Sequence, residues 1–87
     1  MIKEVVHMVK VKLFGVIRLG SGIKETECSA STLTEVFDHV NSISPNNVEP
    51  FTFGDAIVFI NGERVTKQKI NLNDGDEVWL MSPASGG

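Results

Sequence analysis

The sequence has 87 residues, of which 41% are hydrophobic and 22% charged, and its formal net charge is −3. This length fits one folded domain without room for a second core, and the composition excludes intrinsic disorder, collagen-like chains and coiled coils. The mildly acidic balance also argues against nucleic acid as a partner, because proteins that bind a phosphate backbone carry an excess of Lys and Arg. We therefore expect residues 1–87 to form a single domain.

Cysteine usage and the N-terminal segment bear on where the protein works. Cys28 is the single cysteine, so no internal disulfide forms and no second Cys stands at metal-ligand or redox spacing. Residues 1–12 mix Lys and Glu with apolar residues and hold no uninterrupted apolar segment of signal-peptide or membrane length. We expect a cytoplasmic protein without a membrane partner, a metal site or a cofactor of its own.

The first third of the chain predicts a strand, a turn and a second strand. Apolar residues alternate with lysines over residues 9–17, which is typical of a strand with one buried face. Gly20-Ser21-Gly22 predicts a turn, and residues 23–28 predict its hairpin partner.

A helix should follow this hairpin. Thr32 and Glu35 have the three-residue spacing of a capping box, which marks a helix start. The next apolar residues fall at i, i+3, i+4 and i+7, a stripe that should pack on a sheet. These residues are Leu33, Val36, Phe37 and Val40.

The second half predicts a loop and then further strands. Residues 42–54 contain two prolines and a glycine and predict a long loop with little regular structure. The apolar run 56–60 predicts an interior strand, and Asn61-Gly62 predicts a hairpin turn back to a strand that contains Val65.

Asp74-Gly75-Asp76 predicts a final turn, and residues 77–81 predict the last strand. In that strand Val78 and Leu80 face one side while Trp79 and Met81 face the other. Together the elements predict an α+β fold, a mixed sheet with one main helix packed across one face.

Residues 82–87 should form a flexible tail. Pro83 biases Ser82 toward extended geometry and prevents further ladder pairing. Gly86 and Gly87 lack Cβ atoms, so a narrow channel in a partner can close around them. A terminal carboxylate on such an arm can be activated in another enzyme, because adenylation by ATP gives it a good leaving group. The alternative is that the two glycines are a frayed terminus or the remnant of an expression vector.

Four segments, in this order, carry a family resemblance. They are Val11-Lys12-Leu13-Phe14-Gly15, Ile60-Asn61-Gly62-Glu63, Leu72-Asn73-Asp74-Gly75-Asp76-Glu77-Val78 and Ser82-Pro83-Ala84-Ser85-Gly86-Gly87. Together they resemble the sulfur carriers related to ubiquitin. The nearest match is the small subunit of molybdopterin synthase, followed by the thiamine-pathway sulfur carrier, and the resemblance spans nearly the whole chain from Val9 onward.

This resemblance implies a β-grasp fold whose working residue is Gly87. In the family, an E1-like enzyme that uses ATP and Mg²⁺ adenylates the C-terminal glycine, and the product becomes a thiocarboxylate that donates sulfur. Gly87 would carry this chemistry and Gly86 would keep the arm thin. The chain would then be a co-substrate and not an enzyme, and would bind no cofactor itself. Its partners would be the activating enzyme and the molybdopterin synthase large subunit or an equivalent sulfur acceptor.

The resemblance also implies that the open face of the sheet docks onto partners. The outward residues of the first and last strands are Phe14, Trp79 and Met81, and Pro83 and Ser85 lie in the tail. We expect these five residues to contact partners, since aromatic and Met side chains are common in interface hot spots. Alternatively, the loop after the helix partly covers Phe14 and Trp79.

Three other functions remain open at this stage. The chain could carry sulfur for thiamine or another product, or it could be a protein modifier that forms isopeptide bonds through Gly87. It could also be a plain β-grasp interaction module with an incidental tail.

Overall fold

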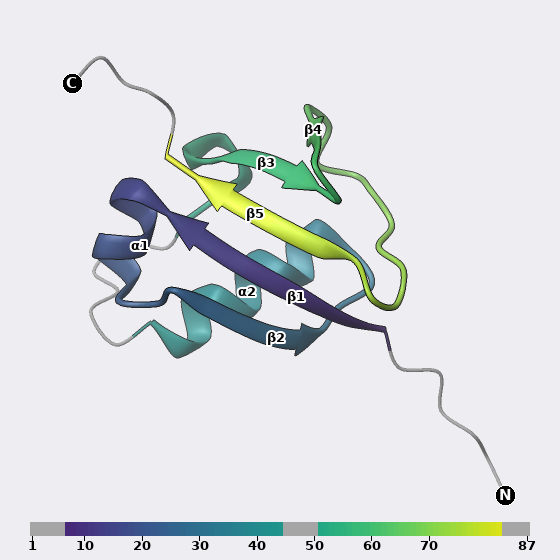
Figure 1. The fold of residues 1–87 in the computed structure, drawn as a ribbon, viewed down its shortest axis with the longest axis horizontal. Coiled ribbons are helices and arrows are strands. Elements are labelled where there is room, and N and C mark those ends of the chain that lie inside the picture. Colours follow the sequence, from purple (N-terminus) through teal and green to yellow (C-terminus); the bar gives the residue numbers. More distant parts are fainter. Residues whose placement is uncertain (1–6, 45–50, 83–87) are drawn as a thin grey trace, which may run out of the picture.

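Five strands form one mixed sheet in the order β2-β1-β5-β3-β4 (Figure 1). The computed structural model describes residues 7–44 and 51–82. The strands are β1 (Met8–Phe14), β2 (Glu25–Ser29), β3 (Ile57–Ile60), β4 (Glu63–Val65) and β5 (Glu77–Met81). The helices are α1 (Gly15–Ser21), α2 (Leu33–Ile43) and a short 3-10 helix, η1 (Phe53–Asp55). The predicted α+β fold is confirmed.

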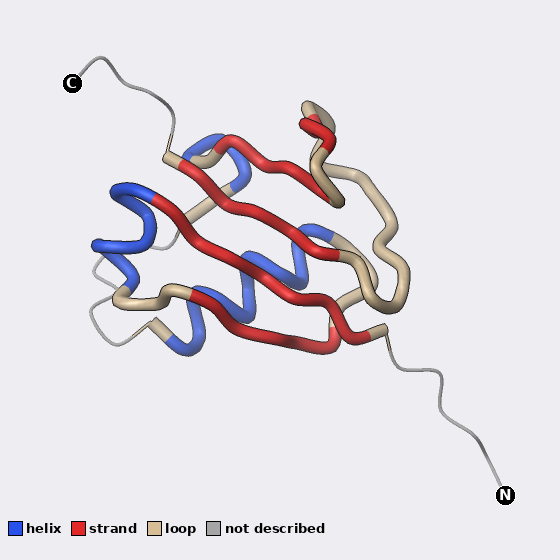
Figure 2. Tube along the Cα trace, in the orientation of Figure 1, coloured by secondary structure: helices blue, strands red, loops and turns tan. Residues whose placement is uncertain are grey.

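The first and last strands of the chain pair in the middle of the sheet. β1 and β5 run parallel, with Val11 opposite Val78 and Leu13 opposite Leu80. The pairs β1–β2, β3–β5 and β3–β4 are antiparallel. Figure 2 shows the strands as one layer with α2 behind it. β5 is therefore hydrogen-bonded along both edges.

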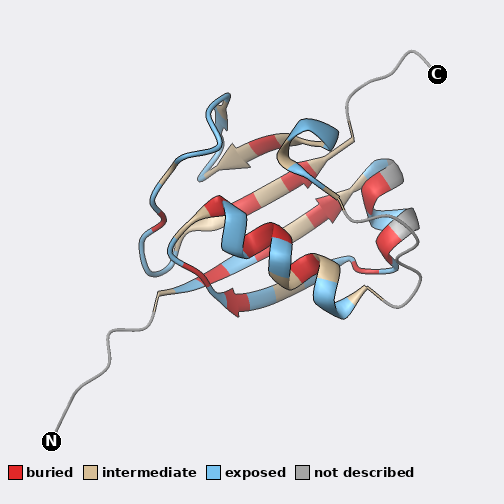
Figure 3. Ribbon diagram, turned by 180° about the vertical axis from the view of Figure 1, so that it is seen from behind, coloured by how far each residue is buried: buried red, intermediate tan, exposed pale blue. Residues whose placement is uncertain are grey.

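The core lies between the sheet and α2. Val9, Val11 and Leu13 of β1 are each at most 1% exposed and alternate with exposed or half-buried residues, as predicted. Figure 3 shows how buried and exposed positions alternate along α2. Its buried residues are the predicted stripe Leu33, Val36, Phe37 and Val40. Burying one such side chain stabilises the fold by roughly 1.5–3 kcal/mol, so packing holds a helix of 11 residues that would be marginal alone.

A capping box starts α2 where the sequence predicted one. The Glu35 N–H donates to Thr32 Oγ1 at 3.3 Å, and the Thr32 N–H donates to Glu35 Oε1 at 3.1 Å. The helix continues to Ile43, so the prediction that the loop begins at residue 42 is wrong.

The loop after α2 also has more regular structure than predicted. Residues 53–55 form η1, at whose start the Asp55 carboxylate accepts the N–H and the hydroxyl of Thr52 at 2.9 and 3.0 Å. The side chain of Asn41 donates to the Phe51 carbonyl at 2.9 Å and accepts the Phe51 N–H at 2.8 Å, which ties this segment to α2. Residues 45–50 of the predicted loop lie outside the described residues.

Helix α1 corrects the prediction for the first third of the chain. The strand predicted over residues 9–17 ends at Phe14, and the turn predicted at residues 20–22 is the end of a helix. Gly15 has a φ of +66° and turns the chain out of the strand, a conformation that is costly for residues with a side chain. Ile17 and Ser21, four residues apart, are buried. A helix, not a tight turn, therefore joins β1 to β2.

The two turns predicted in the second half of the chain are confirmed. Asn61 and Gly62 have φ values of +52° and +86°, as a two-residue hairpin turn requires. Before β5, the Asn73 N–H donates to Asp76 Oδ2 at 2.8 Å, and Gly75 has a φ of +88°. These turns place Glu77 and Trp79 at the start and middle of the central strand.

Candidate functional site: the root of the tail and the open sheet face

The chain leaves the sheet at Ser82, directly beside α1. Ser82 Oγ accepts the N–H of Ile17 at 2.9 Å. Phe14, the N-cap residue of α1, makes no capping bond with its own side chain, so Ser82 caps this helix from the other end of the chain. A Cβ at Gly15 would lie 3.3 Å from Ser82 Oγ. The Gly15 backbone therefore leaves room for the hydroxyl that fixes the root of the tail.

The rest of the predicted tail lies outside the described residues, which end at Ser82. This part includes four predicted site residues: Pro83, Ser85, Gly86 and Gly87. Their predicted roles in partner contact and acyl transfer stay predictions.

The sheet face opposite α2 changes from charged to apolar along its length. The pairing register places Lys10 beside Glu77 at one end and Lys12 beside Trp79 in the middle. Near Ser82 it places Phe14, Met81 and Ile57 side by side. Because side chains alternate along a strand, these residues share the face that the core does not use. The apolar end of the face is thus the end where the tail begins.

Aromatic side chains make up the middle of this face. The Phe14 and Trp79 rings meet edge to face with centroids 5.8 Å apart, and Phe59 lies 6.2 Å from Trp79 on the other side. All three residues are half-buried. Phe59 is not among the predicted site residues, because the continuous apolar run 56–60 shows no alternation that would assign it to a face.

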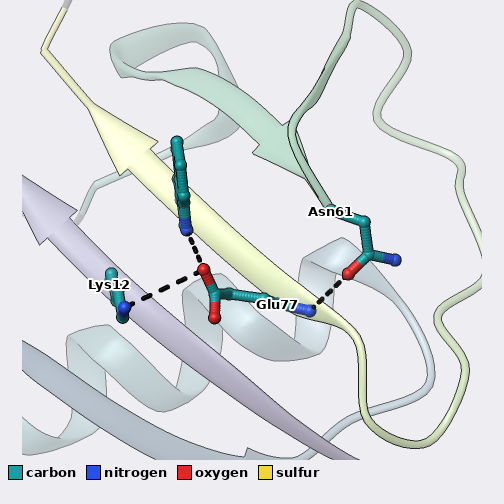
Figure 4. A network of polar contacts seen from close by, with 4 residues as sticks. Lys12, Asn61 and Glu77 are labelled. Carbon is teal, nitrogen blue, oxygen red and sulfur yellow. Dashed lines mark hydrogen bonds and ion pairs between the residues drawn. The ribbon is translucent and has the colours of Figure 1, made fainter.

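Glu77 fixes the orientation of Trp79. The indole Nε1–H donates to Glu77 Oε2 at 2.5 Å, and Lys12 Nζ lies 3.9 Å from the same oxygen. The Glu77 backbone N–H donates to Asn61 Oδ1 at 3.0 Å. Figure 4 shows Glu77 between Lys12 on β1 and Asn61 in the hairpin turn. A face with few free rotamers loses little entropy when a partner binds.

The described part of the loop after α2 packs on the other side of the sheet. Phe53 meets Phe37 of α2 edge to face at 6.4 Å, and Phe51 also packs against the core. Residues 51–53 therefore lie with the helix and not over Phe14 and Trp79. Partner contact by Phe14, Trp79 and Met81 stays a prediction.

Cys28 is buried, with 4% of its surface exposed. Burial raises the pKa of its thiol, and the Glu35 carboxylate raises that pKa further. A neutral buried thiol is a poor nucleophile. Within residues 7–44 and 51–82, no cluster of three or more His, Cys, Asp or Glu side chains could hold a metal ion, and no helix is long and apolar enough to cross a membrane.

Solved structures define the class of this fold. The small archaeal modifier protein 1 (SAMP1) from Methanosarcina acetivorans matches with a TM-score of 0.74 and 24% identity, covering 97% of this chain and 100% of that one. SAMP1 from Haloferax volcanii matches with a TM-score of 0.72 and 21% identity, covering 92% and 99%. A third match is a chain from the complex of subunits 1 and 2 of molybdopterin-converting factor from Helicobacter pylori 26695. Its TM-score is 0.64 and its identity 25%, and the match covers 92% of this chain and 99% of that one. The fold is the ubiquitin-like β-grasp.

The family follows from the sequence. The chain belongs to the ThiS family, whose model matches residues 11–87. A search of curated proteins gives no significant match. The family match confirms the resemblance to ubiquitin-like sulfur carriers.

Proposed function

We propose that this chain is a sulfur carrier that works through the carboxylate of Gly87. The family match carries the proposal, because it runs from the first strand through both C-terminal glycines. The placement of the tail root supports it. The chain leaves a strand held on both edges, next to an apolar face on which a partner can dock.

The proposed reaction takes place in partner enzymes. A Gly87 carboxylate oxygen attacks the α-phosphorus of ATP and pyrophosphate leaves, which gives an acyl adenylate. Sulfide, supplied by the partner, then attacks the acyl carbon and displaces AMP, and the product is the thiocarboxylate. When the sulfur passes to an acceptor, water restores the carboxylate. The activating enzyme holds ATP and Mg²⁺, whose charge offsets that of the phosphates.

Molybdopterin biosynthesis is the destination we propose. The Helicobacter pylori structure contains both subunits of a molybdopterin-converting factor and shares 25% identity with this chain. By this analogy the partners are an E1-like activating enzyme and a synthase large subunit, in the cytoplasm. Phe14, Trp79 and Met81 would meet these partners on the open face, and Pro83 and Ser85 would do so along the tail. A carrier for thiamine or another sulfur product would use the same residues.

The likeness to SAMP1 favours a second candidate, a protein modifier. In that role Gly87 would form an isopeptide bond with a lysine, and the activation step would be the same. The two functions differ in the nucleophile that displaces AMP, which is sulfur in one case and an amine in the other.

The intact mass of the protein from its own host tests the proposal. We expect a fraction in which sulfur replaces one oxygen at Gly87, and this fraction should grow when host extract and ATP are added. A chain that lacks Gly86 and Gly87 is the matched control and should gain no sulfur. Conjugates in which Gly87 is linked to lysine would favour the modifier. Free carboxylate alone, even with extract and ATP, would leave only an interaction module.

A further inference from the structure

An open pocket of about 440 Å³ lies where β1, α1 and the segment leading into β2 meet. Its walls combine three cationic side chains, one carboxylate and two aromatic rings. These are Lys12, Arg18, Lys24, Glu25, Phe14 and Trp79. We call this the basic pocket.

The charge of the basic pocket is opposite to that of the whole chain. The chain carries a net charge of −3, yet three of its eight Lys and Arg side chains line this one pocket with a single Glu. Lys12 already has an ionic partner in Glu77. Within the described residues, Arg18 and Lys24 make no ion pair. Two cations thus remain available to an incoming anion.

The aromatic wall makes the pocket more than a cluster of charges. Trp79 is held by its hydrogen bond to Glu77 and by its edge-to-face contact with Phe14, so this wall is preformed. Phe14 also belongs to the apolar end of the sheet face, beside Met81 and Ile57. The apolar end of the sheet face and the basic pocket are therefore continuous, and one occupant can contact both. A small free anion would use the cations alone.

Helix α1 connects the pocket to the root of the tail. Arg18 lies in the last turn of α1 and lines the pocket, while Ile17, one residue earlier, donates its N–H to Ser82. Figure 1 shows α1 beside the end of β5, where the chain leaves the sheet. Whatever occupies the pocket therefore sits close to that point.

We propose that the basic pocket binds an Asp or Glu side chain, flanked by an apolar residue, on the partner protein that takes up the tail. This inference rests on the proposed function. The carboxylate pairs with Arg18 and Lys24 through charge-assisted hydrogen bonds, and the guanidinium can hold it through two parallel bonds. The flanking apolar residue packs against Phe14 and Trp79.

A charge-reversal variant tests the pocket during activation. The rate of ATP-dependent thiocarboxylate formation in host extract is measured against carrier concentration for the wild-type chain and for R18E/K24E. We expect the concentration for half-maximal rate to rise at least about tenfold in R18E/K24E, with the maximal rate preserved. The matched control is K67E/K69E, which changes the net charge equally at exposed positions between β4 and β5. It should behave as wild type, and thermal unfolding should show that both variants fold.

The outcomes separate the two proposals. A wild-type chain that gains no sulfur contradicts the proposed function. If R18E/K24E gains sulfur as readily as the wild-type chain, the proposed role of the basic pocket is wrong and the proposed function stands. The same conclusion follows if K67E/K69E is impaired as much as R18E/K24E.

Nuclear magnetic resonance tests the pocket without the reaction. The labelled chain is titrated with acetyl-Leu-Glu-Leu-amide and with its Gln counterpart. We expect the Glu peptide alone to shift the Trp79 indole and Arg18 side-chain signals, and R18E/K24E to lose the response. If inorganic phosphate shifts these signals as strongly as the Glu peptide, the pocket is a site for small anions and the proposal is wrong.

Discussion

Phe37 joins α2 to the segment that follows it. The side chain is 5% exposed, belongs to the buried stripe of α2 and packs edge to face on Phe53. Its ring therefore fills a space that neighbouring groups cannot close without moving.

We expect Phe37→Ala to lower the free energy of unfolding by about 3–5 kcal/mol, because it removes apolar contacts and leaves a cavity. Urea unfolding followed by circular dichroism measures this loss. Phe59→Ala is the matched control, since it makes the same chemical change at a half-buried position on the open face, and it should cost clearly less. Equal losses would mean that the open face is part of the core.

At this scale the sequence predicted the core better than the site. Periodicity identified the buried stripe of α2 and the inward residues of β1 and β5. One face of each of these elements is less buried than the other, so polar and apolar residues recur along the sequence at the spacing of a helix or a strand. The run 56–60 carries no such contrast, so Phe59 could not be assigned to a face. Arg18 and Lys24 resemble any exposed cations, and only the fold places them beside Trp79.

Among the elements, α1 depends most on a distant residue. It has seven residues and begins at a glycine, so its intrinsic stability is low. Burial of Ile17 and the bond from its N–H to Ser82 Oγ compensate.

We expect Ser82→Ala to lower the free energy of unfolding by about 0.5–2 kcal/mol, the usual cost of losing an N-cap oxygen. Hydrogen exchange should show faster exchange for the Ile17 amide in particular. Ser29→Ala, at an exposed position on β2, should leave that exchange unchanged. If Ile17 stays protected in Ser82→Ala, the hydroxyl does not cap the helix.

This dependence explains why the sequence did not predict α1. Its cap lies 65 residues away, whereas the caps of α2 and η1 lie within three residues of their partners. The three-residue spacing of Thr32 and Glu35 therefore allowed the cap of α2 to be predicted from the sequence. Thr52 and Asp55 have the same spacing, and this pair was the available signal for η1. Ile17 also falls in phase with Val9, Val11 and Leu13, which concealed the change at Gly15.

At the scale of the molecule, the fold needs both ends of the described chain. β1 and β5 form the middle of the sheet. Residues 82–87 carry no charged or bulky side chain, so the end of the tail has little with which to pack. Periodicity could not supply the parallel pairing of β1 with β5, because alternation shows which side chains face inward and not which strands are neighbours.

Deleting Gly86 and Gly87 should leave the melting temperature unchanged, as calorimetry can measure, while abolishing transfer of sulfur to the chain. Deleting residues 82–87 is the contrasting variant and should lower the melting temperature, because it removes the Ser82 cap. If the shorter deletion also lowers it clearly, the tail is docked on its own domain and the carrier mechanism loses its physical support.

The central position of β5 also determines how the molecule bears force. A pull on the C-terminal end of the chain enters the sheet at Ser82 and runs along the axis of β5. Hydrogen bonds to β1 and β3 lie across that axis on both edges, so many bonds resist together in shear. An edge strand in the same place would peel away one bond at a time. The open sheet face can therefore keep its shape while the chain is pulled at Ser82.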